Sequence, residues 1–186
     1  AGAMYVNPNL RQAGNILSQY IGTTGDAFKD PARGTEIAST FLNQGADIIY
    51  HASGASGAGV FQAVYDAYKN GKDVWAIGVD SDQGLVYKSS DDPEQQAIGD
   101  RILTSMLKRV DTSVYLTGKD FMGGQWKGGY RDFGLDVDGV GYAVNDYNRS
   151  LIEDVMPQVD ELKQKIINGE IVVPTNNEEL QTFQLP

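Results

Sequence analysis

Short apolar runs recur along the first part of the chain and predict the strands of one sheet. Each run is seven or eight residues long and is bounded by glycine or polar residues, which is the usual pattern of a strand. The runs occupy residues 15–22, 46–52, 73–80 and 101–107.

Apolar residues at helical spacing lie on either side of the second run. Ahead of it, Asp30 can cap a helix that begins at Pro31 and stops at Gly45. After it, a glycine-rich turn leads into a second helix that ends at Gly71. Strands and helices that alternate in this way predict the α/β fold class, in which a parallel sheet is flanked by helices in a Rossmann-like lobe.

The signals beyond the third run are more varied. Residues 84–100 are polar and acidic, which favours a surface loop with a short helical turn after Pro93. A helix is expected over residues 108–121, after the last strand. Its predicted inner face carries Val110, Val114 and Phe121.

The C-terminal part of the chain predicts a hairpin and one amphipathic helix. The Asp-Gly pair at 138–139 is a turn signal that predicts a short strand on each side. Apolar residues recur at steps of three and four between 149 and 170, where Pro157 is expected to kink or split the helix and Gly169 to end it. The tail 174–186 is polar and is expected at the surface.

Composition narrows the classes of partner and chemistry. The 186 residues suffice for one α/β domain or one lobe of a larger protein. Fifteen basic and 25 acidic residues leave a formal charge of −10, which disfavours nucleic acid as a partner. The absence of cysteine excludes disulfides, thiol catalysis and cysteine-bound zinc. No apolar run is long enough to span a membrane, and "AGAMYVNPN" lacks a signal-peptide pattern but reads like the end of a helix.

Two loops that follow predicted strands are candidates for binding, because ligands of open parallel sheets lie at the carboxyl ends of the strands. The first is the glycine-rich loop "YHASGASGAG" and the second is "DSDQ". The glycines allow a close backbone approach, but they fit neither the Walker pattern nor GxGxxG. A tight strand-to-helix turn therefore explains them at least as well as a phosphate site does.

Asp80 is the strongest single candidate in these loops. A carboxylate at a strand end accepts two hydrogen bonds from vicinal hydroxyls, such as those of ribose, although an aspartate here is equally typical of a helix cap or turn. Tyr50 could stack on a planar base or complete the edge of the core. Lys108, expected to open a helix, could reach the same crevice or remain solvated.

His51, the only histidine, does not indicate catalysis. No serine lies in a nucleophile-elbow context and no second histidine is present to pair on a metal. We expect no catalytic residue, no metal site and no cofactor, and an isolated histidine is equally compatible with a structural role.

Five stretches carry a recognisable pattern: "NQGADIIYHASGASGAGVFQA", "WAIGVDSDQ", "LTSMLKRVD", "GVGYA" and "KQKIINGEIVVP". They resemble the basic membrane protein family, also called the PnrA-like nucleoside-binding lipoproteins, which are substrate-binding components of bacterial ABC transporters. They run in family order across nearly the whole chain.

The resemblance implies a type I periplasmic-binding-protein architecture, with two lobes that close on a purine nucleoside. By matching position, Asp80 would hold the ribose hydroxyls, Lys108 would reach the same sugar and Tyr50 would stack on the base. Gly54 and its neighbour Ser53 would line the pocket. The resemblance also implies an ABC permease as partner and an extracytoplasmic, lipid-anchored parent protein.

The resemblance further implies that residues 1–186 form the C-terminal lobe of such a protein. Residues from about 107 to 186 include segments expected to return to a first lobe that this chain lacks. Such segments would expose apolar faces, and we expect a homodimer to cover them.

Two other functions stay open at this point. The same fold serves in sensor or regulatory domains, in which the pocket signals to a partner. A small α/β enzyme could use Asp80, Asp82 and His51 around a metal or a sugar, although the sequence contains no recognised catalytic constellation.

Overall fold

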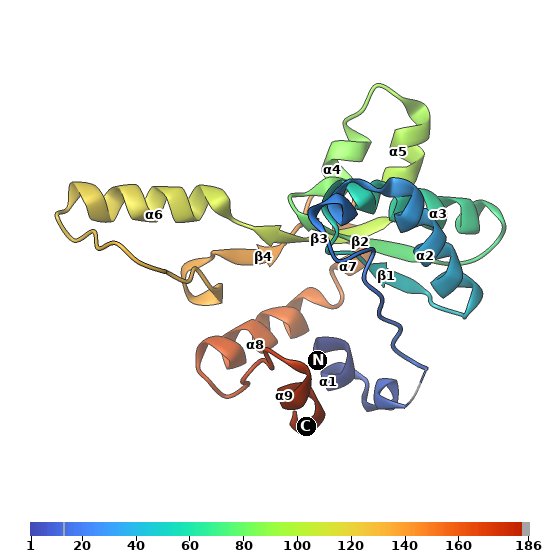
Figure 1. The fold of residues 1–186 in the computed structure, drawn as a ribbon. Helices are drawn as coiled ribbons and strands as arrows, with labels where there is room; N and C mark the ends of the chain where they lie inside the picture. The colour runs from blue at the N-terminus through green and yellow to red at the C-terminus, as the bar shows by residue number, and fades with distance from the viewer. Residues whose placement is uncertain (13, 184–186) are drawn as a thin grey trace. The chain divides into compact units, whose positions relative to one another are not determined.

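A computed structural model describes residues 1–12 and 14–183 and divides the chain into two compact units (Figure 1). One unit combines residues 1–19 with 157–186, and the other comprises residues 20–156. Each unit is described by itself. Within the described ranges, no helix combines the length and the apolar character needed to cross a membrane.

The larger unit is built on a four-stranded sheet in the order β1-β2-β3-β4. β1 (Ile48–Tyr50), β2 (Trp75–Asp80) and β3 (Ile102–Lys108) are parallel, as the sequence predicted. β4 (Val140–Tyr142) pairs with β3 in the antiparallel sense, so the sheet is mixed at this edge.

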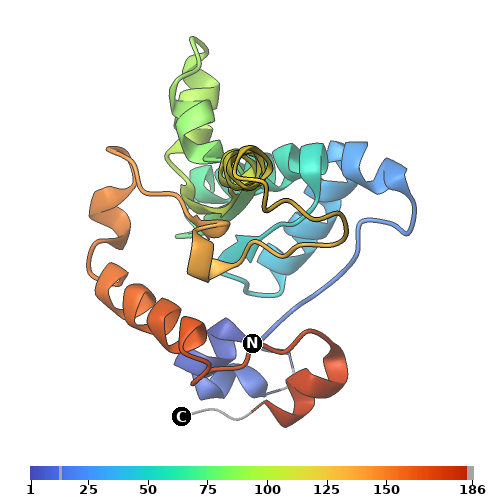
Figure 2. The ribbon, with the colours of Figure 1, turned by 90° about the vertical axis from the view of Figure 1, so that its left-hand side faces the viewer.

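Two long helices cover one face of this sheet (Figures 1 and 2). α2 (Pro31–Asn43) and α3 (Gly57–Lys69) confirm the predicted helices, and the Asp30 side chain accepts a hydrogen bond from the Arg33 N–H as a cap. Apolar residues of the helices and the strands form one core. It contains Ala38, Leu42, Ile49, Val60, Phe61, Ala63, Val64, Val74, Ala76, Ile98 and Ile102.

The prediction for 84–100 is only partly right, because most of this stretch is helical and not a loop, although a helix does begin at Pro93 as expected. α4 (Gln83–Lys88) and α5 (Pro93–Gly99) begin at caps provided by Asp82 and Asp92. Ile98 enters the core, so this acidic stretch helps to close the sheet. Its polar composition hid two short helices of which only one face is buried.

The predicted first strand at 15–22 is also wrong, since the described residues of this stretch contain no strand. A 3-10 helix follows at Gly25–Lys29, and another at Gly54–Ser56 precedes α3. The Ser56 hydroxyl joins the two, because it accepts from the Asp30 N–H and donates to the Ala27 carbonyl.

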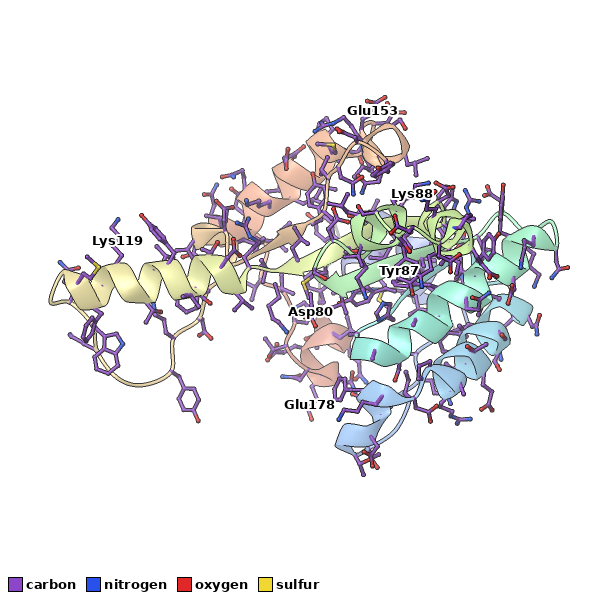
Figure 3. All side chains as sticks on the ribbon, turned by 90° about the horizontal axis from the view of Figure 1, so that it is seen from above. Asp80, Tyr87, Lys88, Lys119, Glu153 and Glu178 are labelled. Carbon is purple, nitrogen blue, oxygen red and sulfur yellow. The ribbon has the colours of Figure 1, made fainter. Side chains whose placement is uncertain are left out.

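α6 (Val110–Met122) confirms a helix after β3, but its predicted inner face is not buried. Val110, Val114 and Phe121 are 55%, 66% and 70% exposed. In Figures 1 and 3 the helix runs on past the carboxyl end of β3, away from α2–α5. The Trp126 ring lies edge-on to Phe121, with 6.4 Å between the ring centroids, but the face remains mostly exposed among the described residues. The periodicity of the sequence could not reveal this exposure.

The predicted hairpin around 138–139 is replaced by a different turn. A 3-10 helix (Leu135–Val137) leads to Asp138, whose φ of 53° is left-handed. β4 follows this turn, but the described stretch before the turn forms no strand to pair with it. The predicted C-terminal helix is divided near Pro157, as expected, into α7 (Arg149–Ile152) and α8 (Met156–Ile167).

The smaller unit collects short elements from both ends of the chain. α1 (Gly2–Val6) and a 3-10 helix (Pro8–Arg11) come from the N-terminal part. α9 (Asn177–Thr182), which has no buried residue, lies in the polar tail that was expected at the surface. The rings of Tyr5 and Phe183 lie 6.1 Å apart, and Arg11 donates to the Phe183 carbonyl. Residues 184–186 of the tail lie outside the described residues.

Candidate functional site

Three of the predicted binding residues are the last residues of three neighbouring strands. Tyr50 ends β1, Asp80 ends β2 and Lys108 ends β3. Because these strands are parallel and adjacent, their carboxyl ends form one edge of the sheet, where Figure 3 labels Asp80. Lys108 therefore closes a strand and does not open a helix, which corrects the prediction of its element.

Asp80 and Lys108 form an ion pair at this edge. The Asp80 Oδ1 and Lys108 Nζ atoms lie 2.7 Å apart, and the two side chains are 50% and 58% exposed. A pair this exposed adds little to stability, about 1 kcal/mol at most. Both charged groups consequently face solvent in a position where they can exchange partners with a ligand.

The backbone at Asp80 has an unusual conformation. Its φ of 69° is left-handed, a region that aspartate tolerates better than most residues other than glycine. The Gln83 side chain accepts a hydrogen bond from the Val79 N–H at 2.8 Å, and the Ser81 N–H donates to the Val79 carbonyl. These bonds define the turn that directs the Asp80 side chain.

The capping function that the sequence left open for Asp80 belongs to Asp82. The Asp82 Oδ1 atom accepts from the Leu85 N–H at the start of α4, and its Oδ2 accepts from the Asn145 side chain at 2.8 Å. Asn145 in turn accepts from the Asn148 N–H. The Asp82 carboxylate therefore links the start of α4 to the segment 145–148. The Asp80 carboxylate is left at the edge with Lys108.

Sequence reasoning missed the polar residues that support this turn. Gln83 fixes Val79, while the buried Asn148 side chain donates to the carbonyls of Leu103 and Ala143. Gln83 stands inside the quoted "DSDQ", so its position was a usable signal. The position of Asn148 gave no such signal, because one of the carbonyls that it bonds, that of Leu103, lies 45 positions away along the chain.

Tyr50 lies near the same carboxylate and is 51% exposed. Partial burial raises the pKa of the Tyr50 phenol, and the negative charge of Asp80 raises it further. The ring thus stays neutral at physiological pH and offers a free apolar face, which suits stacking on a planar group.

The glycine-rich loop follows β1 and turns sharply into α3. Gly54 has a φ of 56°, and a side chain there would contact the Phe28 ring, which favours the turn explanation of this glycine. Ser53 is half-buried, and its hydroxyl lies 3.2 Å from the Nδ1 atom of His51. The Ser53 hydroxyl is therefore directed at His51, the residue that directly follows β1.

His51 is 5% exposed and its ring packs edge-to-face on Phe61, with 4.9 Å between ring centroids. Burial lowers the pKa of the imidazole, while the nearby Gln83 side chain and the Asp80 charge oppose that shift. Within the part of the chain that the structure describes, no group of three or more acidic, histidine or cysteine residues could hold a metal.

A cavity of about 180 Å³ lies elsewhere on the larger unit. Its lining includes Trp75, Lys88, Arg101, Asn145 and Tyr147 but none of the predicted binding residues. Lys88 is paired there with Asp100, and the Arg101 guanidinium is stacked 3.6 Å from the centre of the Trp75 ring. The charged groups of this cavity are engaged with partners in the protein, since Arg101 also pairs with Asp73, so we do not assign the ligand to it.

Comparison with known proteins agrees with this architecture. Residues 1–177 match the family described as ABC transporter substrate-binding protein PnrA-like. Similar curated proteins include the CD4+ T-cell-stimulating antigen of Listeria monocytogenes, 36% identical over 94% of this chain and 46% of that protein. Basic membrane protein D of Borreliella burgdorferi is 34% identical over 100% of this chain and 48% of that protein.

A solved structure supports the fold as well. The solute-binding protein of an ABC transporter system from Aeropyrum pernix superposes with a TM-score of 0.65 at 28% identity, covering 97% of this chain and 55% of that one. The chain thus spans about half the length of the proteins that it matches. Its sheet flanked by helices is that of periplasmic-binding-protein-like lobes, and the chain belongs to the PnrA-like family of ABC transporter substrate-binding proteins.

Proposed function

We propose that this chain is the nucleoside-binding C-terminal lobe of a solute-binding protein that delivers its ligand to an ABC importer. The observation that carries the proposal is the Asp80–Lys108 pair at the carboxyl edge of the sheet, exposed and free of any capping function. The family match supports a substrate-binding role. The nucleoside class is what the resemblance to the PnrA-like nucleoside-binding lipoproteins implies, and the groups at this edge are compatible with it.

The edge offers a complementary group for each part of a nucleoside. The Asp80 carboxylate can accept hydrogen bonds from both vicinal hydroxyls of ribose, and the Lys108 ammonium can donate to a sugar oxygen. The half-exposed Tyr50 ring can stack on the base. The ribose hydroxyls would take the place of Lys108 on part of the Asp80 carboxylate. Because the ion pair is half-exposed, breaking it costs little free energy.

We also propose that the function is binding without catalysis. A nucleoside-processing enzyme built on Asp80, Asp82 and His51 would need these three groups to converge on one reacting atom. Asp82 is bonded to α4 and to Asn145, and His51 is buried against Phe61. This engagement supports a binding protein over an enzyme.

The exposed face of α6 supports a two-lobed parent protein. Residues 107–186 would include the segments that return to a first lobe, and the uncovered apolar side chains of α6 are what such a segment would display. The family also leads us to propose an extracytoplasmic, lipid-anchored parent that meets an ABC permease.

Nucleoside binding is tested by titrating the chain with adenosine, guanosine, inosine and cytidine, followed by calorimetry and by amide chemical shifts. We expect saturable shifts at Tyr50, Asp80 and Lys108. The 2′-deoxy form of the best ligand should bind about tenfold more weakly, because it leaves a charged acceptor without one hydrogen bond. Unchanged spectra at millimolar concentrations of all four nucleosides would contradict the proposed ligand.

We expect two copies of the isolated chain to associate through the α6 face. The segment 109–136 has no net charge in a chain of −10, so two such faces meet without repulsion. Its charged residues are Arg109, Lys119, Lys127 and Arg131 against Asp111, Asp120, Asp132 and Asp136. Its exposed apolar side chains on α6 are Val110, Val114, Tyr115, Phe121 and Met122.

Light scattering coupled to size exclusion measures this association. The chain should elute as a dimer at high concentration, and Phe121→Glu should shift it to the monomer by placing a charge on the apolar face. Lys119→Gln, at an exposed position of the same helix, changes the net charge of the segment by the same one unit as Phe121→Glu without altering an apolar side chain, so it is the matched control and should remain dimeric. A monomeric wild-type chain at millimolar concentration would overturn the dimer.

A further inference from the structure

His51 is a buried titratable residue next to the proposed binding edge, and the function proposed above does not use it. Its ring rests directly on Gly57, where a Cβ atom would lie 2.0 Å from the imidazole Cε1. Phe61 closes the other side, and the Ser53 hydroxyl reaches Nδ1. The Nε2 atom is buried and has no hydrogen-bond partner among the described residues.

The groups that act on the His51 ring come from the elements that form the Asp80 turn. From β2, the Asp80 carboxylate is the charged group that favours the protonated ring, and from α4 the Gln83 side chain does the same. α3 presents Gly57 and Phe61, which do not titrate. On β1 itself, Tyr50 also feels the charge of Asp80.

The Gln83 side chain, which favours the protonated imidazole, also holds the backbone of the turn. Its Oε1 atom accepts from the Val79 N–H, one residue before the left-handed Asp80. A change of charge on His51 therefore acts on Asp80 in two ways. It acts through space by the attraction of opposite charges and through Gln83 by displacing the side chain that holds the turn.

We propose that His51 is a positioning residue for Asp80, and that protonation of its imidazole releases the ligand held at this edge. The release of a nucleoside rests on the function proposed above, whereas the coupling between His51 and Asp80 can be measured without any ligand.

The sign of the effect follows from burial. Desolvation disfavours the imidazolium, so the pKa of His51 lies below its ordinary value and the ring is neutral at pH 7. A nucleoside over this edge removes more water and occupies the carboxylate that compensates the positive charge. Binding should therefore lower the pKa of His51 further, and by linkage affinity must fall as the ring becomes protonated.

The first measurement uses the fact that His51 is the only histidine of the chain. Its Cε1 proton gives a single imidazole signal, and titration of that signal between pH 4 and pH 8 reports the pKa directly. Asp80→Asn should lower this pKa, because it removes the carboxylate that favours the charged ring. Glu36→Gln, which removes an exposed carboxylate of α2, is the control and should leave the pKa unchanged. Equal pKa values in wild type and Asp80→Asn would overturn the coupling.

The second measurement follows nucleoside affinity from pH 7.5 to pH 5.0. Wild type should lose affinity as the ring becomes protonated, by up to about tenfold for each unit by which the ligand lowers the pKa of His51, whereas His51→Gln should show a flat profile. His51→Asn serves if the glutamine variant fails to fold. Parallel pH profiles in wild type and variant contradict the release mechanism. No binding at any pH contradicts the proposed function alone, because the coupling is decided by the first measurement.

Discussion

Asp80→Asn is expected to weaken nucleoside binding by roughly ten- to a hundredfold with only a small change in the melting temperature. Hydrogen bonds to a charged group contribute about 1.5–3 kcal/mol each, and the amide retains only one acceptor oxygen for the two ribose hydroxyls. Asparagine also tolerates the left-handed backbone at this position, where φ is 69°, so the variant changes the charge and preserves the turn.

Calorimetry and thermal melting on the same samples separate affinity from stability. Because the Asp80–Lys108 pair is half-exposed, its loss should change the free energy of unfolding by about 1 kcal/mol at most. Asp91→Asn changes an exposed carboxylate between α4 and α5 and is the control that should bind normally. Equal nucleoside affinity in Asp80→Asn and wild type would remove Asp80 from the site.

Lys108→Met extends this test to the other half of the pair. If both residues contact the same sugar, the double variant should lose less affinity than the sum of the single losses. Additive losses would indicate that the two side chains act on separate parts of the ligand.

Gly59→Ala is expected to destabilise the larger unit by about 3 kcal/mol or more, the upper range for an overpacked core. A Cβ atom at this position would lie 1.8 Å from the Pro31 carbonyl oxygen and 2.7 Å from the Thr35 hydroxyl. Both partners belong to α2, and Thr35 already donates to the Pro31 carbonyl and contacts the carbonyl of Gly59. Neither helix can move without opening the core between them.

Melting followed by circular dichroism should show a decrease of roughly 10 °C for Gly59→Ala, given the usual 2–4 °C per kcal/mol at this chain length. Gly118→Ala is the matched control, because no atom lies within 4 Å of its Cβ position on exposed α6. Alanine there should leave the melting temperature unchanged or raise it slightly, since it favours the helix. An unaltered melting temperature for Gly59→Ala would show that α2 and α3 are not held at this contact.

The sequence was sufficient to predict those helices and strands whose own residues mark where they begin, which face is apolar and where they end. Asp30 and Pro31 define the start of α2, and the apolar runs at 46–52, 73–80 and 101–107 all became strands. These features depend on short-range backbone preferences and on burial of one face. Both can be read from neighbouring residues.

The candidate site was predictable to the same degree. The carboxyl ends of adjacent parallel strands must share one edge, so Tyr50, Asp80 and Lys108 could be grouped once the strands were recognised. The sequence could not tell which aspartate of "DSDQ" caps α4. That choice depends on Asn145, which bonds to Asp82 from 63 positions further along the chain.

Long-range pairing accounts for what the sequence could not show. Residues 15–22 have the composition of a strand, yet a strand needs a partner, and the described residues of this stretch have none. The apolar face of α6 has the right period, yet it stays mostly exposed among the residues that the structure describes. Composition and period show which residues are apolar and lie on one face of an element. Only the assembled sheet and helices determine which of these residues are buried, because burial requires a neighbouring element that the local sequence does not specify.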